Sequence, residues 1–178
     1  YGANAIYYDF NPGRIEPIDA NSSINEKQLA KKHAFEPAFY IDAEQKLTDK
    51  FSVNYGLRYS MFYRLGEQNI NIYANNQPVT YDADLDIYEK ATPIDTKYYG
   101  KNETIASFDN LEPRIALAYT INDKQSVKAS YNRMSQYLHL ISNTQSPTPL
   151  DIWTPSDNFL KPQILDQFAV GYFKNIKN

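Results

Sequence analysis

The sequence predicts an all-β fold: an open segment of a transmembrane antiparallel β-barrel with about six long strands in a meander. Three observations predict it. Long stretches alternate between apolar and polar side chains, the connections are alternately short and long, and 15% of the residues are aromatic. Aromatic residues favour strands, and so many of them disfavour disorder. The net charge of −3 gives no basic footprint, so nucleic acid is not an expected partner.

The clearest alternation runs from Phe51 to Arg64. The odd positions from Phe51 to Tyr63 are apolar or aromatic, and the even positions are mostly polar. Successive side chains of a strand point to opposite faces, so this strand has one apolar and one polar face. The thirteen residues Phe51–Tyr63, at ~3.3 Å each and tilted by ~40°, span about 33 Å, which matches the ~30 Å hydrocarbon core of a bilayer. Strands of this length are rare in soluble β-sandwiches.

Other stretches carry the same signature, least clearly the first of them. In "AFEPAFYIDAEQKL" apolar side chains occupy most odd positions and charged ones most even positions, and "SVKASYNR" alternates in the same way. The expected strands lie near residues 2–10, 34–48, 51–66, 110–122, 125–137 and 163–174. Six strands cannot close even the smallest common barrel of ~8, so we expect this chain to be part of one larger barrel domain.

The connections support the same architecture. Thr48-Asp49-Lys50 and Asn122-Asp123-Lys124 are tight polar turns that join antiparallel neighbours. Long loops are expected near residues 11–33, 67–110 and 137–162. Soluble domains seldom hold several such connections, whereas membrane barrels have short periplasmic turns and long extracellular loops. Within the second loop, "NIYANNQPVTY" (71–81) predicts a hairpin that turns at Asn75-Asn76.

The alternation assigns side chains to the two faces. Leu57, Tyr59, Ile115, Leu117 and Val127 are expected to face lipid, and Asn54 the lumen. The polar faces also carry a set of charged residues, which comprises Asp42, Glu44, Arg58, Glu112, Arg114 and Lys128. Two interpretations of this set remain open. The charges pair across neighbouring strands or against a plug, or they form a charged wall along a permeation path.

No motif indicates an enzyme, a metal site or a cofactor. Asp82, Asp84 and Asp86 have the spacing that begins a calcium loop, but Ile87 and Pro93 occupy the positions of its glycine and its last ligand. His33 and His139 lie in or beside expected loops without a paired ligand. Nucleophile–histidine pairs and phosphate-binding glycine loops are likewise not recognisable in the sequence.

Ligand recognition by such a barrel is expected in the long loops, because loops on a rigid scaffold carry binding. Trp153 and Phe159 lie in the proline-rich stretch "PTPLDIWTPSDNFLKP" (147–162), where they could stack on a sugar or an aromatic chelator. Tyr98 and Tyr99 offer the same surface in the preceding loop. The alternative for all four is packing that keeps the loops folded over the barrel mouth.

Several motifs resemble the barrel of TonB-dependent outer-membrane receptors. "NLEPRIALAYTINDKQSVKASYNRMSQY" (110–137) is similar to that family's E-P-R strand, short turn and K-A-S-Y strand, and "FLKPQILDQFAVGYFKN" (159–175) is similar to its next strand. "YGLRYS" (55–60) and "NPG" (11–13) also fit. The resemblance implies a 22-strand barrel, a plug domain inside it and energy supplied through TonB. The plug domain and the TonB-binding motif are absent from this sequence.

The sequence thus predicts a barrel segment of an active-transport receptor in the outer membrane of a Gram-negative bacterium. Its cargo would be a scarce nutrient, such as an iron chelate, a corrinoid, an oligosaccharide or a peptide, bound at the extracellular loops. Expected partners are outer-membrane lipid, the TonB complex through the missing N-terminal part, and in some systems a surface lipoprotein. The alternatives are a secreted or surface β-protein with a structural or adhesive role, and a passive porin-like channel.

Overall fold

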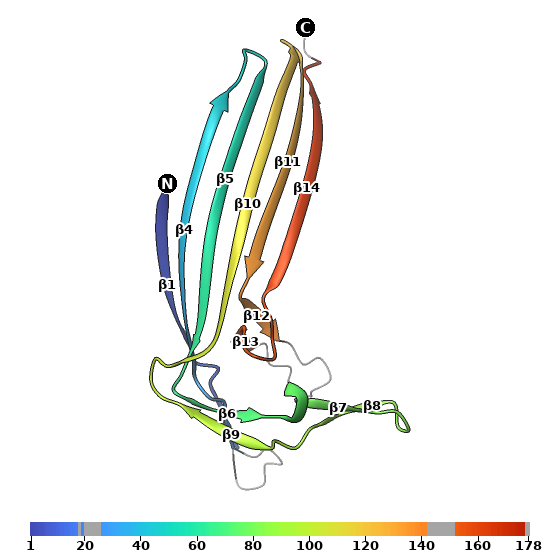
Figure 1. The fold of residues 1–178 in the computed structure, drawn as a ribbon. Helices are drawn as coiled ribbons and strands as arrows, with labels where there is room; N and C mark the ends of the chain where they lie inside the picture. Colours follow the sequence, from blue (N-terminus) through green and yellow to red (C-terminus); the bar gives the residue numbers. More distant parts are fainter. Residues whose placement is uncertain (18, 20–25, 142–151, 177–178) are drawn as a thin grey trace.

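The computed structural model describes residues 1–17, 19, 26–141 and 152–176, and its main feature is one curved antiparallel sheet (Figure 1). The sheet consists of β1 (Gly2–Phe10), β4 (Lys32–Lys46), β5 (Phe51–Leu65), β10 (Thr104–Asn122), β11 (Gln125–Gln136) and β14 (Gln163–Lys174). These six strands are neighbours in chain order, so the sheet is a meander. The described residues contain no α-helix, and the predicted fold class is confirmed. No helix among them could cross a membrane.

The strands follow the alternation closely, with one difference. β10 begins at Thr104, six residues before the expected start at residue 110. The register between β10 and β5 shifts between Thr104 and Ala106, and beyond that shift Phe108 lies on the polar face and Asp109 on the apolar face, the reverse of the pattern from Leu111 onward. Ile105 and Ala106 are consequently both buried, although they are neighbours in sequence. A bulge of this kind breaks the period of two on which the prediction depends.

The two expected short turns are present, and polar side chains hold them. The Oγ1 of Thr48 accepts hydrogen bonds from the backbone N–H groups of Lys50 and Phe51, at 3.2 and 3.0 Å. The Oδ1 of Asn122 accepts one from the backbone N–H of Lys124, at 3.0 Å. Such side-chain acceptors stabilise tight turns, so each turn fixes the register of its hairpin.

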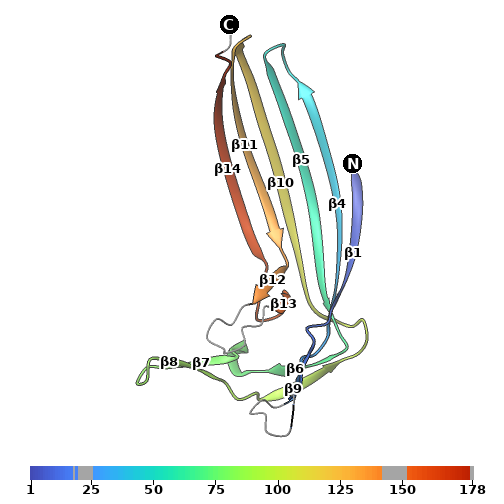
Figure 2. The ribbon, with the colours of Figure 1, turned by 180° about the vertical axis from the view of Figure 1, so that it is seen from behind.

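The long connections contain short strand pairs of their own. β2 (Arg14–Ile15) pairs with β3 (Lys27–Gln28), and β12 (Leu138–Ile141) pairs with β13 (Ile152–Pro155). The loop between β5 and β10 holds the pairs β6 (Gln68–Ile72) with β9 (Asp95–Tyr99) and β7 (Val79–Asp82) with β8 (Ile87–Lys90). These pairs gather at one end of the sheet, and the β7–β8 hairpin projects sideways from it (Figures 1 and 2).

The predicted hairpin over residues 71–81 is wrong in its pairing. Asn75 and Asn76 do form a turn, with φ values of 53° and 57°. That turn leads from β6 into β7 without pairing them, because β6 pairs with β9 and β7 pairs with β8. Asparagine tolerates positive φ in many kinds of turn, so an Asn-Asn pair alone does not select a hairpin.

Register places the side chains of the sheet on two distinct faces. We call one of them the apolar face. On β10 it carries the odd-numbered residues from Leu111 to Ile121, which include Ile115 and Leu117. Its charged side chains lie near the strand ends: Asp9, Asp109, Arg133 and Asp166 toward the long loops and Lys174 at the opposite end. On β10, the ten steps from Leu111 to Ile121 at ~3.4 Å, tilted by ~40°, give a charge-free stretch about 26 Å tall, as lipid contact requires. On β11 and β14 the Arg133–Asp166 ion pair ends the charge-free stretch earlier, beside Pro113 of β10.

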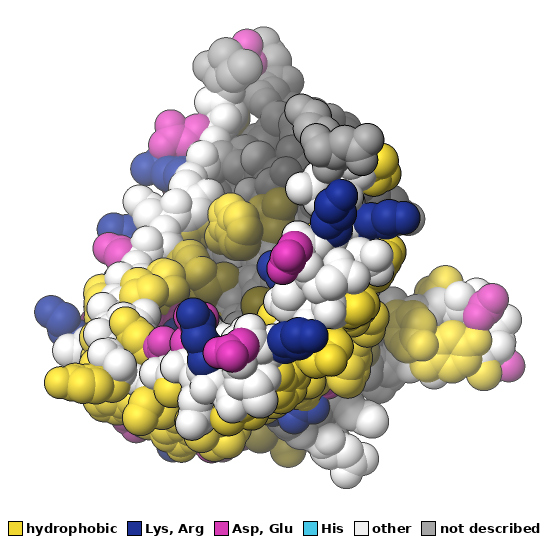
Figure 3. All heavy atoms as spheres, turned by 90° about the horizontal axis from the view of Figure 1, so that it is seen from above, with side chains coloured by type: hydrophobic (Ala, Val, Ile, Leu, Met, Phe, Trp, Pro, Cys, Tyr) yellow, Lys and Arg dark blue, Asp and Glu magenta, His cyan; other side chains and the backbone are white. Residues whose placement is uncertain are grey.

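Seen along the strands, hydrophobic side chains gather on the outer margin of the arc (Figure 3). The opposite face of the sheet, which we call the polar face, holds Asn54, Arg58, Arg114 and Lys128. Leu57, Tyr59, Ile115, Leu117 and Val127 share the apolar face. The register therefore separates these two sets as the alternation predicted.

The sheet is open at both edges. In the described residues β1 pairs only with β4, and β14 pairs only with β11. The expectation that the first and last strands do not pair with each other is confirmed. An unpaired strand edge in hydrocarbon leaves N–H and C=O groups unsatisfied, so neither edge is stable there without a further partner.

Candidate functional site

A buried network of charged and hydroxyl groups crosses four strands on the polar face. The guanidinium of Arg58 donates to both carboxylate oxygens of Glu112, at 3.2 and 3.0 Å, and to Oε1 of Glu36, at 3.2 Å. The hydroxyl of Tyr8 donates to the other Glu36 oxygen, and that of Ser60 donates to Glu112. We call these five residues the Arg58 network. One cation between two carboxylates, with further hydrogen bonds to each, is a well-satisfied arrangement for buried charge.

Strand alternation explains how these side chains meet. Arg58 is paired directly with Glu112 across β5 and β10, and with Tyr40 across β5 and β4. Glu36 lies on the same face of β4 as Tyr40, since the two differ by an even number of residues. Opposite charges on facing positions of neighbouring strands stabilise a sheet, and here they join β1, β4, β5 and β10.

Tyr137 closes this network at the end of β11. Its ring stacks on Phe62 with centroids 4.8 Å apart and planes 3° apart. Its hydroxyl lies 2.7 Å from the Oγ of Ser60 and accepts a hydrogen bond from the side chain of Asn110, at 2.9 Å. Only 3% of Tyr137 is exposed, so the chain after β11 turns inward onto the polar face.

The β12–β13 hairpin follows Tyr137 and covers the same end of the polar face. The ammonium of Lys32 donates to the hydroxyl of Thr154 at 2.5 Å, and β13 packs against β4. The backbone N–H of Ser156 donates to the carbonyl of Tyr137, and its hydroxyl lies 2.9 Å from Nε2 of His139. Burial lowers the pKa of His139, although the carboxylate of Asp157 partly opposes this effect. We call Tyr137 and this hairpin the cover.

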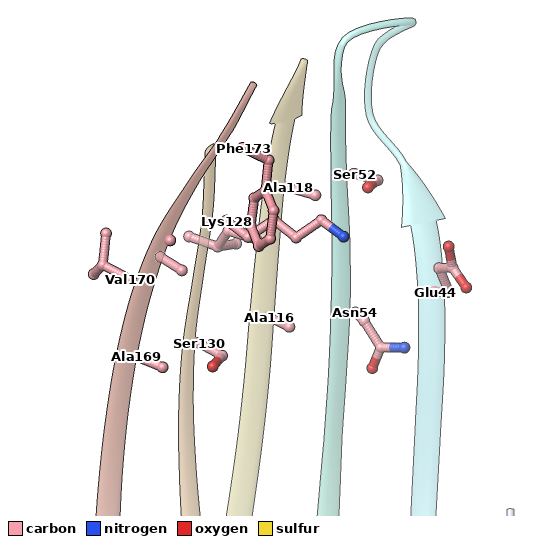
Figure 4. Close-up of a pocket in the computed structure, with 13 residues that line it drawn as sticks. Glu44, Ser52, Asn54, Ala116, Ala118, Lys128, Ser130, Ala169, Val170 and Phe173 are labelled. Atoms are coloured by element: carbon pink, nitrogen blue, oxygen red, sulfur yellow. The ribbon is translucent and has the colours of Figure 1, made fainter. Parts of the chain in front are cut away.

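The other half of the polar face is open and lined by small side chains. A hollow of about 530 Å³ lies over β5, β10, β11 and β14 (Figure 4). Its floor includes Ser52, Ala116, Ala118, Ser130, Ala169 and Gly171. Glu44 lies at one side of it, and the side chain of Lys128 extends from β11 across it toward β5 (Figure 4). Small side chains across four neighbouring strands let another backbone approach the sheet closely.

The predicted charged set divides between these two halves. Arg58 and Glu112 belong to the buried network. Asp42, Glu44 and Arg114 are exposed and have no ion pair or side-chain hydrogen bond with any residue that the structure describes. Within the described part of the chain, the Lys128 ammonium makes a cation–π contact, with Nζ 5.3 Å from the centre of the Phe173 ring. Pairing across neighbouring strands therefore applies to Arg58 and Glu112. A charged wall along a permeation path stays a prediction for the exposed charges.

The four loop aromatics are not brought together into one site. Trp153 is 54% exposed on β13, and Phe159 makes an edge-to-face contact with Tyr73. Tyr98 donates a hydrogen bond to Glu67 at 2.6 Å, which raises the pKa of its phenol. Tyr99 packs under the ammonium of Lys97. Their role in ligand binding stays a prediction.

Within the described ranges, no group of three or more histidine, aspartate or glutamate side chains could hold a metal ion. His33 lies beside Asp9, with 3.5 Å between Nδ1 and the carboxylate, and His139 bonds to a serine. The carboxylate of Asp82 accepts from the backbone N–H groups of Asp84 and Leu85. These acidic residues therefore form the β7–β8 turn.

The sequence interpretation missed the residues that join strands far apart in the chain. Ser60 and Tyr137 are 77 residues apart, and Tyr8 and Glu36 are 28 apart. Glu36 could have been found, because it lies on the polar side of an alternating stretch beside other charged residues. Tyr137 had no such signal, because it follows the last residue of an alternating strand.

A curved antiparallel sheet with an apolar belt on one face and charged side chains on the other defines a membrane-spanning β-barrel protein. Comparison with protein families gives the particular family. The model of an outer membrane beta barrel domain matches residues 7–164, and the chain belongs to this family. It is accordingly a protein of the Gram-negative outer membrane. Searches of curated proteins and of solved structures found no match.

Proposed function

We propose that this chain forms part of the barrel of a TonB-dependent outer-membrane receptor, which imports a scarce nutrient by active transport. The observation that carries the proposal is the open half of the polar face. Glu44 and Lys128 line a hollow floored by small residues. Asp42 and Arg114 lie next along the same face, opposite Gly56. A folded domain inside the lumen would fill the hollow and supply partners for these charges.

The resemblance of residues 110–137 and 159–175 to TonB-dependent receptors supports the same proposal. In it, further strands continue the sheet beyond β1 and β14, and a plug domain occupies the lumen. The loops after β5 and β11 then lie outside the cell, and the turns at Asp49 and Asp123 lie in the periplasm. Neither this chain nor the barrel acts as an enzyme.

A passive channel is the second candidate, because exposed charges also line water-filled pores. Conductance distinguishes the two. The purified whole protein is inserted into planar bilayers, and binding of the periplasmic domain of TonB is measured on the same preparation. A receptor blocks ion flow at rest and binds TonB. Steady ohmic conductance without TonB binding would identify a passive channel.

A further inference from the structure

Arg64 is a buried cation with no carboxylate partner among the residues that the structure describes. Only 2% of its surface is exposed. Its guanidinium donates to the backbone carbonyls of His33 and Leu65 and to the side-chain carbonyl of Gln68. All three acceptors are neutral, and no described carboxylate lies within ion-pair distance of Arg64. Buried charges in proteins are normally paired with an opposite charge, so an anion next to Arg64 would stabilise its buried guanidinium.

Lys32 adds a second positive charge at the same place. Arg64 pairs with Ala34 across β5 and β4, and Lys32 lies two residues from Ala34 on the same face. The two cations repel each other. The half-buried ammonium of Lys32 donates to the neutral hydroxyl of Thr154, at 2.5 Å.

Asp157 is the described carboxylate whose charge acts on both cations. Its Oδ1 already accepts hydrogen bonds from the backbone N–H groups of Phe159 and Leu160, both at 2.9 Å. It makes no ion pair with Lys32 or Arg64 among the described residues. One carboxylate, outside ion-pair distance and already hydrogen-bonded, thus acts on two cations, and the local charge balance is positive.

The geometry points to a binding site for an oxyanion-bearing ligand, a carboxylate or a phosphate, at Lys32 and Arg64. The cover lies over the pair and contributes the hydroxyl of Thr154, which an anion replaces as partner of Lys32. Arg64 is held by its three carbonyl acceptors, so it is positioned before the ligand arrives. A forked guanidinium beside an ammonium suits two oxygens of one oxyanion.

This inference rests on the proposed receptor function only for the role of the ligand as cargo. Its test needs neither TonB nor transport, so the two can fail separately. The purified whole protein is titrated calorimetrically with citrate and, in parallel, with inorganic phosphate. Lys32→Gln and Arg64→Gln are compared with Lys97→Gln, a cation at the same end of the sheet that contacts Tyr99.

We expect saturable binding of one probe, weakened at least tenfold by Lys32→Gln and by Arg64→Gln and less than twofold by Lys97→Gln. Citrate binding without phosphate binding identifies a carboxylate ligand, and the reverse identifies a phosphate. Lys32 is half-buried, so its variant keeps the test valid where Arg64→Gln impairs folding. The inference is overturned when neither probe binds, or when Lys97→Gln weakens binding as much as Lys32→Gln does. If neither probe binds and Lys32→Gln lowers the melting temperature, Lys32 and Arg64 instead pair with a structural carboxylate elsewhere in the protein.

Discussion

Leu117→Arg tests the assignment of the two faces most directly. Leu117 lies on the apolar face of β10, five positions before the strand ends at Asn122. Five steps at ~3.4 Å and a tilt of ~40° place it about 13 Å from the turn, close to the middle of a ~30 Å hydrocarbon core. An arginine at the midplane of a membrane barrel costs roughly 2–4 kcal/mol. At ~1.4 kcal/mol per factor of ten, the folding equilibrium should fall by a factor of about 30 to 700.

The matched control is the adjacent residue. Ala118 lies on the polar face and lines the open hollow, so Ala118→Arg adds the same charge in the same strand without contact with lipid. We expect it to change the free energy of unfolding by less than about 1 kcal/mol. Both variants of the whole protein are folded into lipid vesicles and unfolded with urea. If Ala118→Arg costs as much as Leu117→Arg, the two faces are assigned wrongly.

Three further predictions follow from the polar face and the loops. Glu112→Ala leaves Arg58 with Glu36 as its one carboxylate partner and should lower the free energy of unfolding by about 3–5 kcal/mol. The control is Asp42→Ala, which removes an exposed carboxylate and should change that free energy by no more than about 0.5 kcal/mol. Equal effects of the two substitutions would refute the Arg58 network. Cysteines placed at Asp49 and Asp123 should resist an impermeant maleimide on intact cells and one at Asp84 should react, and the reverse pattern would invert the proposed topology. The cover should detach from the polar face more readily in acid. Burial lowers the pKa of His139, so the cover binds fewer protons when it is docked on the sheet than when it is released. Docking is therefore strongest above the ordinary histidine pKa of ~6.5 and weakens as the pH falls below it. The rate of thiol labelling at Ala34→Cys, which lies beneath the cover, should therefore rise from pH 8 to pH 5, and this rise should be lost in a His139→Gln background. Asn54→Cys on the open half of the polar face is the control. A labelling rate at Ala34→Cys that does not depend on pH would contradict the prediction.

The sheet was predictable because its information is local. The alternation from Phe51 to Tyr63 reflects two solvents, lipid and a polar interior, on opposite sides of one strand, and each residue reports its own side. The turns at Thr48 and Asn122 were predictable because their hydrogen bonds lie within three residues. The early start of β10 was not, since a bulge interrupts the period that carries the signal.

The cover and the cation pair could not be predicted, because they depend on contacts between distant segments. Nothing in the residues around Tyr137 indicates that its ring lies on Phe62. Lys32 and Thr154 meet across 122 residues, and the sequence places them in two separate expected loops, 11–33 and 137–162. The pairing of β6 with β9 likewise bypasses the Asn-Asn turn that the local sequence offers. Loop docking of this kind is decided by the surface on which the loop lands.

The number of residues between paired strands also determines the order in which the strand pairs form. The turns at Thr48 and Asn122 join β4 to β5 and β10 to β11 through a few residues, whereas residues 66–103 separate β5 from β10. Loop-closure entropy grows as (3/2)RT ln n, so joining ends across 38 residues rather than 4 costs about 2 kcal/mol more. The β4–β5 and β10–β11 hairpins therefore form early. The pairing of β5 with β10, which we call the seam, joins these two hairpins late. Slow steps in the assembly of this sheet should accordingly respond to changes along the seam, such as those at Leu57 and Pro113, more than to changes within either turn.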